Sequence, residues 1–332
     1  MASSQIELRQ PQHFTDISYV VTQSSGDGPL DVSIILPDEI NYNTDIPAIG
    51  ELSKLVGRFR SLTIDVPYQE AWQKFVTGIG EGQAAPILES LVIKVKRDVL
   101  NRTTGPFTEL STCFTPSPAL HNLQFPAWPL PATNPPQLAT ITSLAIITPF
   151  YGLDIPPLFA IIQAAPNLEK FTFKSLDVGD ESDPNDFASQ RVHLPRLTSV
   201  DVTSPGFGLD LLSNFDAPNL VDVRLDGFRG VITDDRWNLD DWGEFMTDPS
   251  YRIISTLSQR SKSIRKLELR YMYFTNPDTE FRRILSGEML PKLEELILER
   301  TNITDEILTA TRSPTIKKVD VHNCKYVTQP TA

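Results

Sequence analysis

The sequence of 332 residues has only two cysteines, Cys113 and Cys324, and no apolar run long enough to cross a membrane. Two cysteines cannot form a disulfide framework, which indicates a reducing compartment. The most apolar stretch, Leu138 to Ala165, is interrupted by prolines and by Asp154, whereas a membrane helix needs about 20 apolar residues in succession. The first residues, MASSQIELRQ, have neither the basic nor the apolar region of a signal peptide. We therefore expect a cytoplasmic or nuclear protein that has no membrane partner.

Basic residues are too few for a surface that holds nucleic acid by charge. The chain has 30 Lys and Arg against 42 Asp and Glu, which gives a formal net charge of −12. Polyanions are bound by clustered basic side chains, so we expect no nucleic-acid partner. The acidic balance favours a basic protein partner instead.

Sequence motifs of catalysis and metal binding are also missing. There is no G-x-S-x-G, H-E-x-x-H, C-x-x-C or P-loop, and only His322 lies at ligand spacing from a cysteine, Cys324. The glycine-rich stretch 78–82 follows a predicted helix, so it predicts a helix end and a turn. The acidic stretch 177–186 lacks the spacing of a calcium loop and is interpreted as solvated. We expect no enzyme, cofactor or metal, although a triad of residues distant in sequence stays open.

Proline is abundant, with 27 residues, and it marks an internal repeat. In each copy an apolar residue, called the anchor here, is followed by two further apolar residues, three and five positions later. Ten anchors recur with a mean spacing of about 29 residues, at the upper end of the range for leucine-rich repeats. Seven copies carry Pro two residues before the anchor: Pro86–Ile93, Pro118–Phe125, Pro166–Phe173, Pro195–Val202, Pro218–Leu225, Pro291–Leu298 and Pro314–Val321. Three copies lack it: Phe59–Ile64, Ile141–Ile146 and Ile264–Leu269.

Helical patterns separate these copies. Thr279 and Thr304 are candidate N-caps, and proline after a helix prevents its continuation. Short strands joined by helices favour parallel pairing and right-handed connections. The expected fold is therefore α/β, a right-handed leucine-rich-repeat solenoid (horseshoe) of about ten irregular repeats, with a parallel sheet on the concave face and helices on the convex face. The predicted helices are Gln69–Val76, Pro157–Ala165, Arg252–Gln259, Glu280–Leu285 and Asp305–Ala310.

The repeats divide the chain into two parts. Residues 1–56 are expected to form an N-terminal cap, because a solenoid needs its end covered. Its elements are a helix at Ile17–Gln23, a strand at Leu30–Leu36 and a helix at Asp45–Val56. Residues 57–332 form the array, which a long step between anchors interrupts with an insertion at 226–250.

Two opening segments, Ser24–Leu36 (SSGDGPLDVSIIL) and Leu55–Ile64 (LVGRFRSLTI), precede the Pro-marked units. Together they resemble the leucine-rich-repeat region of fungal F-box proteins, especially those of mushroom-forming fungi. The resemblance implies the substrate-recognition part of a ubiquitin-ligase receptor that binds a protein target on its concave face. The family's F-box, a three-helix module before the repeats, is not recognisable in this chain. A Skp-type adaptor and a cullin are therefore expected only if an F-box lies upstream.

The residues that alternate with the buried leucines should face outward and meet the partner. This outward set mixes both signs, which favours selective protein recognition over phosphate binding. Tyr271 and Tyr273 follow one strand and could form a hot spot with Arg270, since Tyr and Arg are favoured there; alternatively, Tyr271 and Phe274 are turn residues of the core. The proposed partner-binding residues on the strands are Lys94, Lys174, Asp201, Arg224, Asp226, Glu268, Arg270, Glu299 and Asp320.

The insertion holds Trp237 and Trp242 among acidic residues. Long loops are usually functional or disordered, so these tryptophans form either a flap over a ligand site or a local cluster. Two other functions stay open: an enzyme or small-molecule receptor with its site under this flap, and a degenerate repeat protein without its adaptor-binding module.

Overall fold

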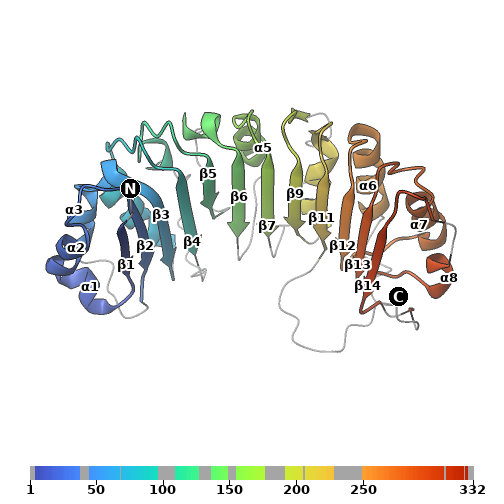
Figure 1. Ribbon diagram of the computed structural model, residues 1–332, viewed down its shortest axis with the longest axis horizontal. Coiled ribbons are helices and arrows are strands. Elements are labelled where there is room, and N and C mark those ends of the chain that lie inside the picture. The colour runs from blue at the N-terminus through green and yellow to red at the C-terminus, as the bar shows by residue number, and fades with distance from the viewer. Residues whose placement is uncertain are drawn as a thin grey trace. The chain divides into compact units, whose positions relative to one another are not determined.

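A computed structural model shows an α/β protein with two compact units, 1–150 with 156–167 and 151–155 with 168–332. Each unit has parallel strands with helices on one face of the sheet (Figure 1). The structure describes residues 4–37, 45–67, 69–95, 109–126, 136–148, 155–175, 191–204, 206–227, 249–309, 312–324 and 326–327.

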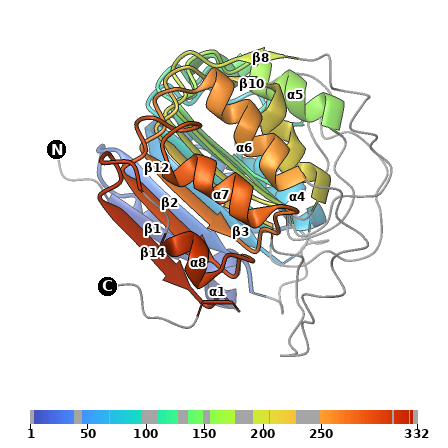
Figure 2. The same ribbon diagram turned by 90° about the vertical axis from the view of Figure 1, so that its right-hand side faces the viewer.

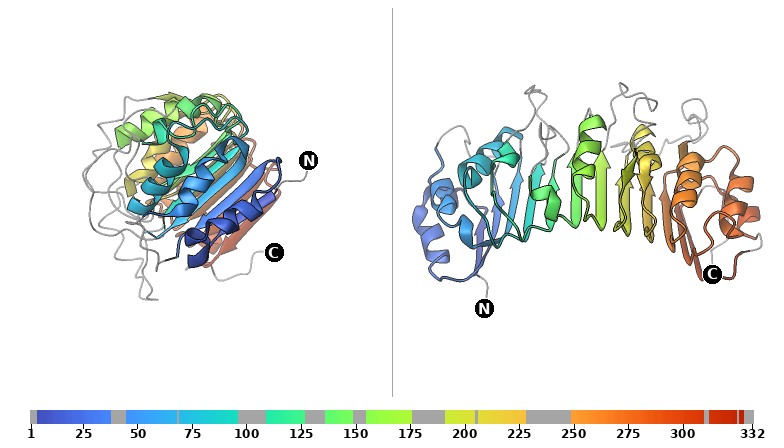
Figure 3. Two further views of the ribbon diagram at one scale, coloured as in Figure 1. Left: turned by 90° about the vertical axis from the view of Figure 1, so that its left-hand side faces the viewer. Right: turned by 90° about the horizontal axis from the view of Figure 1, so that it is seen from above.

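In the first unit each strand pairs in parallel with the next strand along the chain, and the helices cover one face (Figure 3). The strands are β1 (Ser4–Leu8), β2 (Leu30–Ile35), β3 (Phe59–Val66), β4 (Ser90–Val95), β5 (Asn122–Phe125) and β6 (Ser143–Thr148). The helices are α1 (Pro11–Thr15), α2 (Ile17–Gln23), α3 (Pro47–Ser53), α4 (Gln69–Gly80) and α5 (Ile155–Gln163), with short 3-10 turns η1 (Val56–Arg58), η2 (Glu109–Ser111) and η3 (Pro136–Thr140).

The second unit has the same organisation (Figure 2). Its main strands are β7 (Lys170–Ser175), β9 (Ser199–Thr203), β11 (Asp222–Asp226), β12 (Lys266–Arg270), β13 (Glu295–Glu299) and β14 (Lys318–His322). Two short strands, β8 (Val192–His193) and β10 (Phe215–Asp216), pair separately. The helices are η5 (Gly206–Asn214, 3-10), α6 (Pro249–Arg260), α7 (Pro277–Leu285) and α8 (Asp305–Leu308).

The repeated proline occupies the second position of a tight turn before the strand. The N–H of Leu88 donates to the carbonyl of Ala85 at 3.2 Å, and the N–H of Leu220 donates to that of Ala217 at 3.1 Å. Proline suits this position because its φ is already near the value that the turn requires. The same bond closes the turns at Leu120, Leu197, Leu293 and Ile316.

The two apolar residues after each anchor face the helices and form the core. From β3 to β13 their side chains are at most 2% exposed, as the alternation along a strand predicts. Complete burial of one such side chain contributes about 1.5–3 kcal/mol. Each of the ten predicted copies contains a strand, so the strand positions are confirmed. These core residues include Leu62, Ile64, Leu91, Ile93, Phe171, Phe173, Val200, Val202, Val223, Leu225, Leu267, Leu269, Leu296 and Leu298.

The N-terminal region departs from the prediction of helix, strand and helix. Neither β1 nor α1 was predicted; in β1, residues 4–8 lack the proline and the anchor that identify the other strands. Both β1 and β2 pair in the same sheet as β3. The helix expected at 45–56 is shorter, ending at Ser53.

Of the two predicted N-caps, one is confirmed and one is wrong. The hydroxyl of Thr304 accepts a hydrogen bond from the N–H of Ile307 at 3.4 Å. Thr279 lies inside α7, which begins at Pro277 after Asn276, because proline is well suited to the first helical position. The glycine-rich stretch 78–82 ends α4 and turns at Gly82, where φ is +65°, as predicted.

Candidate functional site

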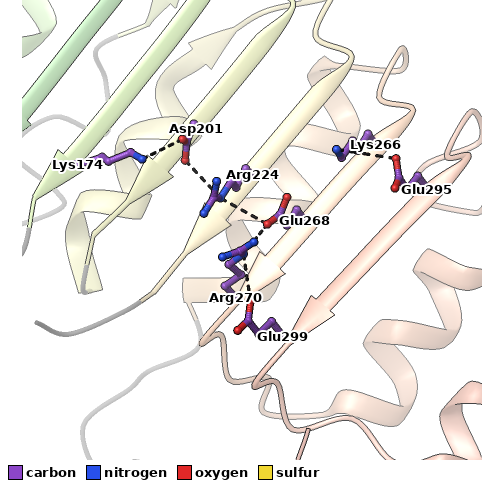
Figure 4. Close-up of polar contacts among 8 residues, drawn as sticks. All are labelled: Lys174, Asp201, Arg224, Lys266, Glu268, Arg270, Glu295 and Glu299. Atoms are coloured by element: carbon purple, nitrogen blue, oxygen red, sulfur yellow. Dashed lines mark hydrogen bonds and ion pairs between the residues drawn. The ribbon is translucent and has the colours of Figure 1, made fainter. Parts of the chain in front are cut away.

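The face of the second unit's sheet that lies away from its helices carries a row of ion pairs (Figure 4). We call this face the open face. Lys174 and Asp201 are 3.3 Å apart, and Asp201 is 3.7 Å from Arg224. Glu268 follows, 3.5 Å from Arg224 and 2.5 Å from Arg270, which also lies 3.3 Å from Glu299. We call the six residues the charge ladder: Lys174, Asp201, Arg224, Glu268, Arg270 and Glu299.

Strand register places these side chains together. Asp201, Arg224 and Glu268 are directly opposite one another on β9, β11 and β12, and Arg270 is opposite Glu299. Opposite charges on cross-strand neighbours stabilise a sheet. The signs alternate along the ladder, so each charge has an opposite charge beside it.

Burial follows from this packing of long side chains. Glu268 is only 8% exposed although it faces outward, and Asp226 is equally buried. Burial lowers the pKa of Arg270, but the charge and hydrogen bond of Glu268 act more strongly together and keep that pKa above its ordinary value. The six ladder residues are therefore already paired with one another within the chain.

A second group of charges, Asp222, Lys266, Glu295 and Lys318, lies one step earlier along β11 to β14 and was not predicted from the sequence. Lys266 and Glu295 are 3.9 Å apart, and Lys318 lies 3.0 Å from Glu295 and 2.6 Å from Asp320. Burial raises the pKa of Asp222; Lys266 lowers it, and neighbouring carboxylates raise it further. The alternation of the strands, extended by one step toward their beginnings, could have identified these residues.

The outward charges of β7, β9, β11, β12, β13 and β14 nearly cancel. Six are basic and seven are acidic, so this face has no excess of positive charge to hold a polyanion. The basic residues are Lys170, Lys174, Arg224, Lys266, Arg270 and Lys318, and the acidic ones are Asp201, Asp222, Asp226, Glu268, Glu295, Glu299 and Asp320.

The corresponding face of the first unit is mostly uncharged. Ser61, Ser90, Asn122 and Ser143 lie in one row across β3 to β6, and the amide of Asn122 donates to the hydroxyl of Ser90 at 2.8 Å. Lys94, which the sequence analysis placed among the partner-binding residues, is exposed on β4 opposite Asp65. It is not a member of the charge ladder.

Aromatic side chains follow β12. Tyr271 and Tyr273 are half-buried, and the guanidinium of Arg300 lies 5.1 Å from the centre of the Tyr271 ring. Phe274 is fully buried, with its ring centre 4.5 Å from that of Phe281. Phe274 is therefore a core residue, whereas Tyr271, Tyr273 and Arg300 remain partly accessible.

Strands β12, β13 and β14 end in the same way. Tyr271, Arg300 and Asn323 each follow a strand directly and have φ of 49°, 51° and 54°. This left-handed conformation is uncommon outside glycine, so its recurrence shows that the three repeats share one turn geometry.

Gly227 marks where the insertion leaves the sheet. Its N–H donates to the carbonyl of Arg270 at 2.9 Å, and a Cβ at this position would lie 2.6 Å from the backbone oxygen of Tyr271. The described chain ends here and begins again at Pro249. Trp237, Trp242 and the acidic stretch 177–186 lie outside the described residues.

The opening segments that carry the family resemblance bind each other. The guanidinium of Arg58 donates to the carbonyls of Ser24 and Gly28 at 3.0–3.1 Å. Arg60 and Ser61 both donate to the carboxylate of Asp31, at 3.0 and 2.9 Å. These polar residues hold β2 and β3 together at the start of the array.

Within the described ranges, no three His, Cys, Asp or Glu side chains are grouped as a metal site would require. None of the helices in those ranges is long and apolar enough to span a membrane. Cys324, two residues after His322, is buried with its sulfur 3.4 Å from the hydroxyl of Thr301.

No protein-family model matches the chain, and no curated protein matches it. Among solved structures, a protein from Bacteroides fragilis is similar at 12% identity over 57% of this chain and 69% of its own, with a TM-score of 0.23. A likeness of this size carries no argument about function.

Proposed function

We propose that the chain is a leucine-rich-repeat solenoid, a horseshoe of irregular repeats, that binds a protein partner on the open face of its second unit. The observation that carries this proposal is the charge ladder, in which six outward side chains from five parallel strands alternate in sign. A fixed pattern of both signs discriminates between protein partners by charge complementarity. The near-neutral total disfavours nucleic acid and leaves the sign of the partner's own charge open.

The strand ends extend this surface. Arg270, at the end of the ladder, is followed by the partly accessible Tyr271 and Tyr273. Tyr and Arg are enriched among residues that dominate binding energy. In this proposal the aromatic pair anchors the partner, and the ladder fixes its orientation.

By resemblance, the partner is a protein held for ubiquitination, and the chain is the substrate-recognition part of an F-box-type receptor in the cytoplasm or nucleus. This part of the proposal rests on the opening segments and the Pro-marked repeats. A Skp-type adaptor and a cullin belong to the complex if an F-box lies upstream. Purification of the native protein, with determination of its intact mass, tests this part of the proposal. A heavier chain that co-purifies with the adaptor and the cullin supports it. A chain of 37.2 kDa that co-purifies with neither protein refutes it.

Binding by the open face is tested with charge reversals. The variant R224E/R270E reverses two ladder residues, and K262E/R282E reverses two exposed residues on the helical side with the same change of net charge. Quantitative mass spectrometry of proteins captured by each variant should show one partner lost from R224E/R270E and kept by K262E/R282E. A partner that both variants retain equally would exclude the open face.

A further inference from the structure

The two outermost strands of the described sheets differ in how their free edges are protected. At β1, the hydroxyl of Tyr19 donates to the carbonyl of Glu7 at 3.0 Å, and Glu7 lies at a position whose backbone faces away from β2, as the pairing register shows. At β14, no strand of the described chain pairs with the edge away from β13 (Figure 2). Exposed edges of this kind are templates for pairing with another chain.

The backbone of β14 shows which groups face this outer edge. The N–H of Lys318 donates to the carbonyl of Glu294, and the N–H of Arg300 donates to the carbonyl of His322. With this register, Lys318, Asp320 and His322 pair with β13. The backbone groups of Val319 and Val321 therefore point to the outer edge.

The core is also less covered at this edge. Val319 is 8% exposed and Val321 is half-buried, whereas their neighbours Leu296 and Leu298 on β13 are 0% and 1% exposed. The anchor Ile316 is half-buried, although the corresponding Leu293 is fully buried. Apolar surface that every other repeat buries against its neighbour is thus left partly accessible here.

The charges on β14 fit a second copy of the same strand. In an antiparallel pair with its two-fold axis at Val319, the two Val319 residues exchange backbone hydrogen bonds, and Lys318 stands opposite Asp320 of the other copy. This is a non-hydrogen-bonded position, where side chains approach most closely, and opposite charges there are favourable. The same surface on both copies is what a two-fold interface requires.

We propose that the chain forms a homodimer in which the β14 strands of two copies pair antiparallel around Val319. The pairing extends the sheet of each copy and covers Val319 and Val321. It also places Lys318 of each copy beside Asp320 of the other, in addition to the ion pair that these two residues form within one chain. This inference does not depend on the proposed function, because none of the six ladder residues lies on β14.

Light scattering with size-exclusion chromatography and sedimentation of the full chain tests the proposal. The wild type should be a dimer that dissociates on dilution. V319P should be monomeric, because it removes an outward N–H that β13 does not use, and proline is tolerated on edge strands. A monomeric wild type at every concentration would overturn the proposal.

Charge exchange supplies the control for folding. K318E and D320K each place like charges opposite one another and should weaken the dimer at least tenfold, while K318E/D320K restores opposite charges and should recover it. Circular dichroism should be the same for all variants. A dimer that V319P and both single reversals leave unchanged would show that another surface associates.

Discussion

The side-chain amide of Asn302 binds both backbone groups of Phe274. Its oxygen accepts from the N–H of Phe274 at 3.0 Å, and its nitrogen donates to the carbonyl of Phe274 at 2.7 Å. The two residues are 28 positions apart and belong to successive repeats, and Asn302 is only 6% exposed. Asn302 is the first residue of an Asn-Ile-Thr sequence, the acceptor pattern for glycosylation. Its side-chain nitrogen, to which a glycan would be attached, instead donates a buried hydrogen bond to Phe274.

Replacing Asn302 by alanine should destabilise the second unit. The change leaves a buried N–H and a buried carbonyl of Phe274 without partners, at about 1–3 kcal/mol for each group. Urea unfolding measures the loss. N219A is the control, because the exposed amide of Asn219 donates to only one carbonyl, that of Pro195; a loss as large as that of N302A would contradict the role assigned to Asn302.

Replacing glycine by alanine at two positions should change the stability of the protein in opposite directions. A Cβ at Gly80, in the last turn of α4, would lie 2.5–2.8 Å from the buried ring of Phe114, and such overpacking costs about 1–3 kcal/mol. Gly50 lies inside α3 with nothing within 4 Å of a Cβ, and alanine there should stabilise the protein by about 0.5–1 kcal/mol. Thermal unfolding of G80A and G50A measures both, and a stable G80A would show that the Phe114 ring moves easily.

Glu268 should be the most important member of the charge ladder for stability. Its side chain is 10% exposed and lies between Arg224 and Arg270, so E268A removes two partly buried ion pairs and brings two cations together. We expect a loss of about 1–2 kcal/mol, above the range of exposed pairs. E294A also removes two ion pairs, but their cations, Lys317 and Arg265, are exposed. It should lose much less in the same denaturant titration; equal losses would mean that the ladder is no stronger than ordinary surface pairs.

The raised pKa of Asp222 predicts how the free energy of unfolding changes with pH. Burial raises its pKa in the folded state, so the folded protein holds this proton more tightly than the unfolded chain does. The stability from the protonated group is present below the unfolded pKa and is lost as pH rises through the folded pKa. D222N should therefore be more stable than the wild type at neutral pH, with the difference disappearing in acid; unfolding titrations of both proteins over this range check it.

The sequence predicts the strands better than it predicts the site. Proline before an anchor such as Leu220 and alternating apolar residues such as Val223 are local signals, so the strands are found at the expected positions. β1 has neither signal and was missed. The alternation along a strand is enough to predict that a side chain such as that of Arg224 faces outward. Its ion-pair partners depend on the register between neighbouring strands, which the sequence pattern does not give.

Other contacts depend on approaches between distant segments. Asn302 looks like an ordinary loop residue in the sequence, and its role emerges only when the turn at Phe274 lies beside it. Gly227 is equally inconspicuous, although the backbone oxygen of Tyr271 leaves no room for a side chain there. The tryptophans of the insertion remain a prediction, since they lie beyond the part of the chain that the structure describes.

The most direct test of the central claim is a calorimetric titration of the purified partner into three proteins: the wild type, R224E/R270E and K262E/R282E. If the open face binds the partner, the wild type and K262E/R282E have the same Kd, and R224E/R270E binds at least tenfold more weakly while its circular dichroism spectrum shows that it is still folded. If all three bind with the same Kd, the partner does not use the charge ladder and the proposed function is wrong.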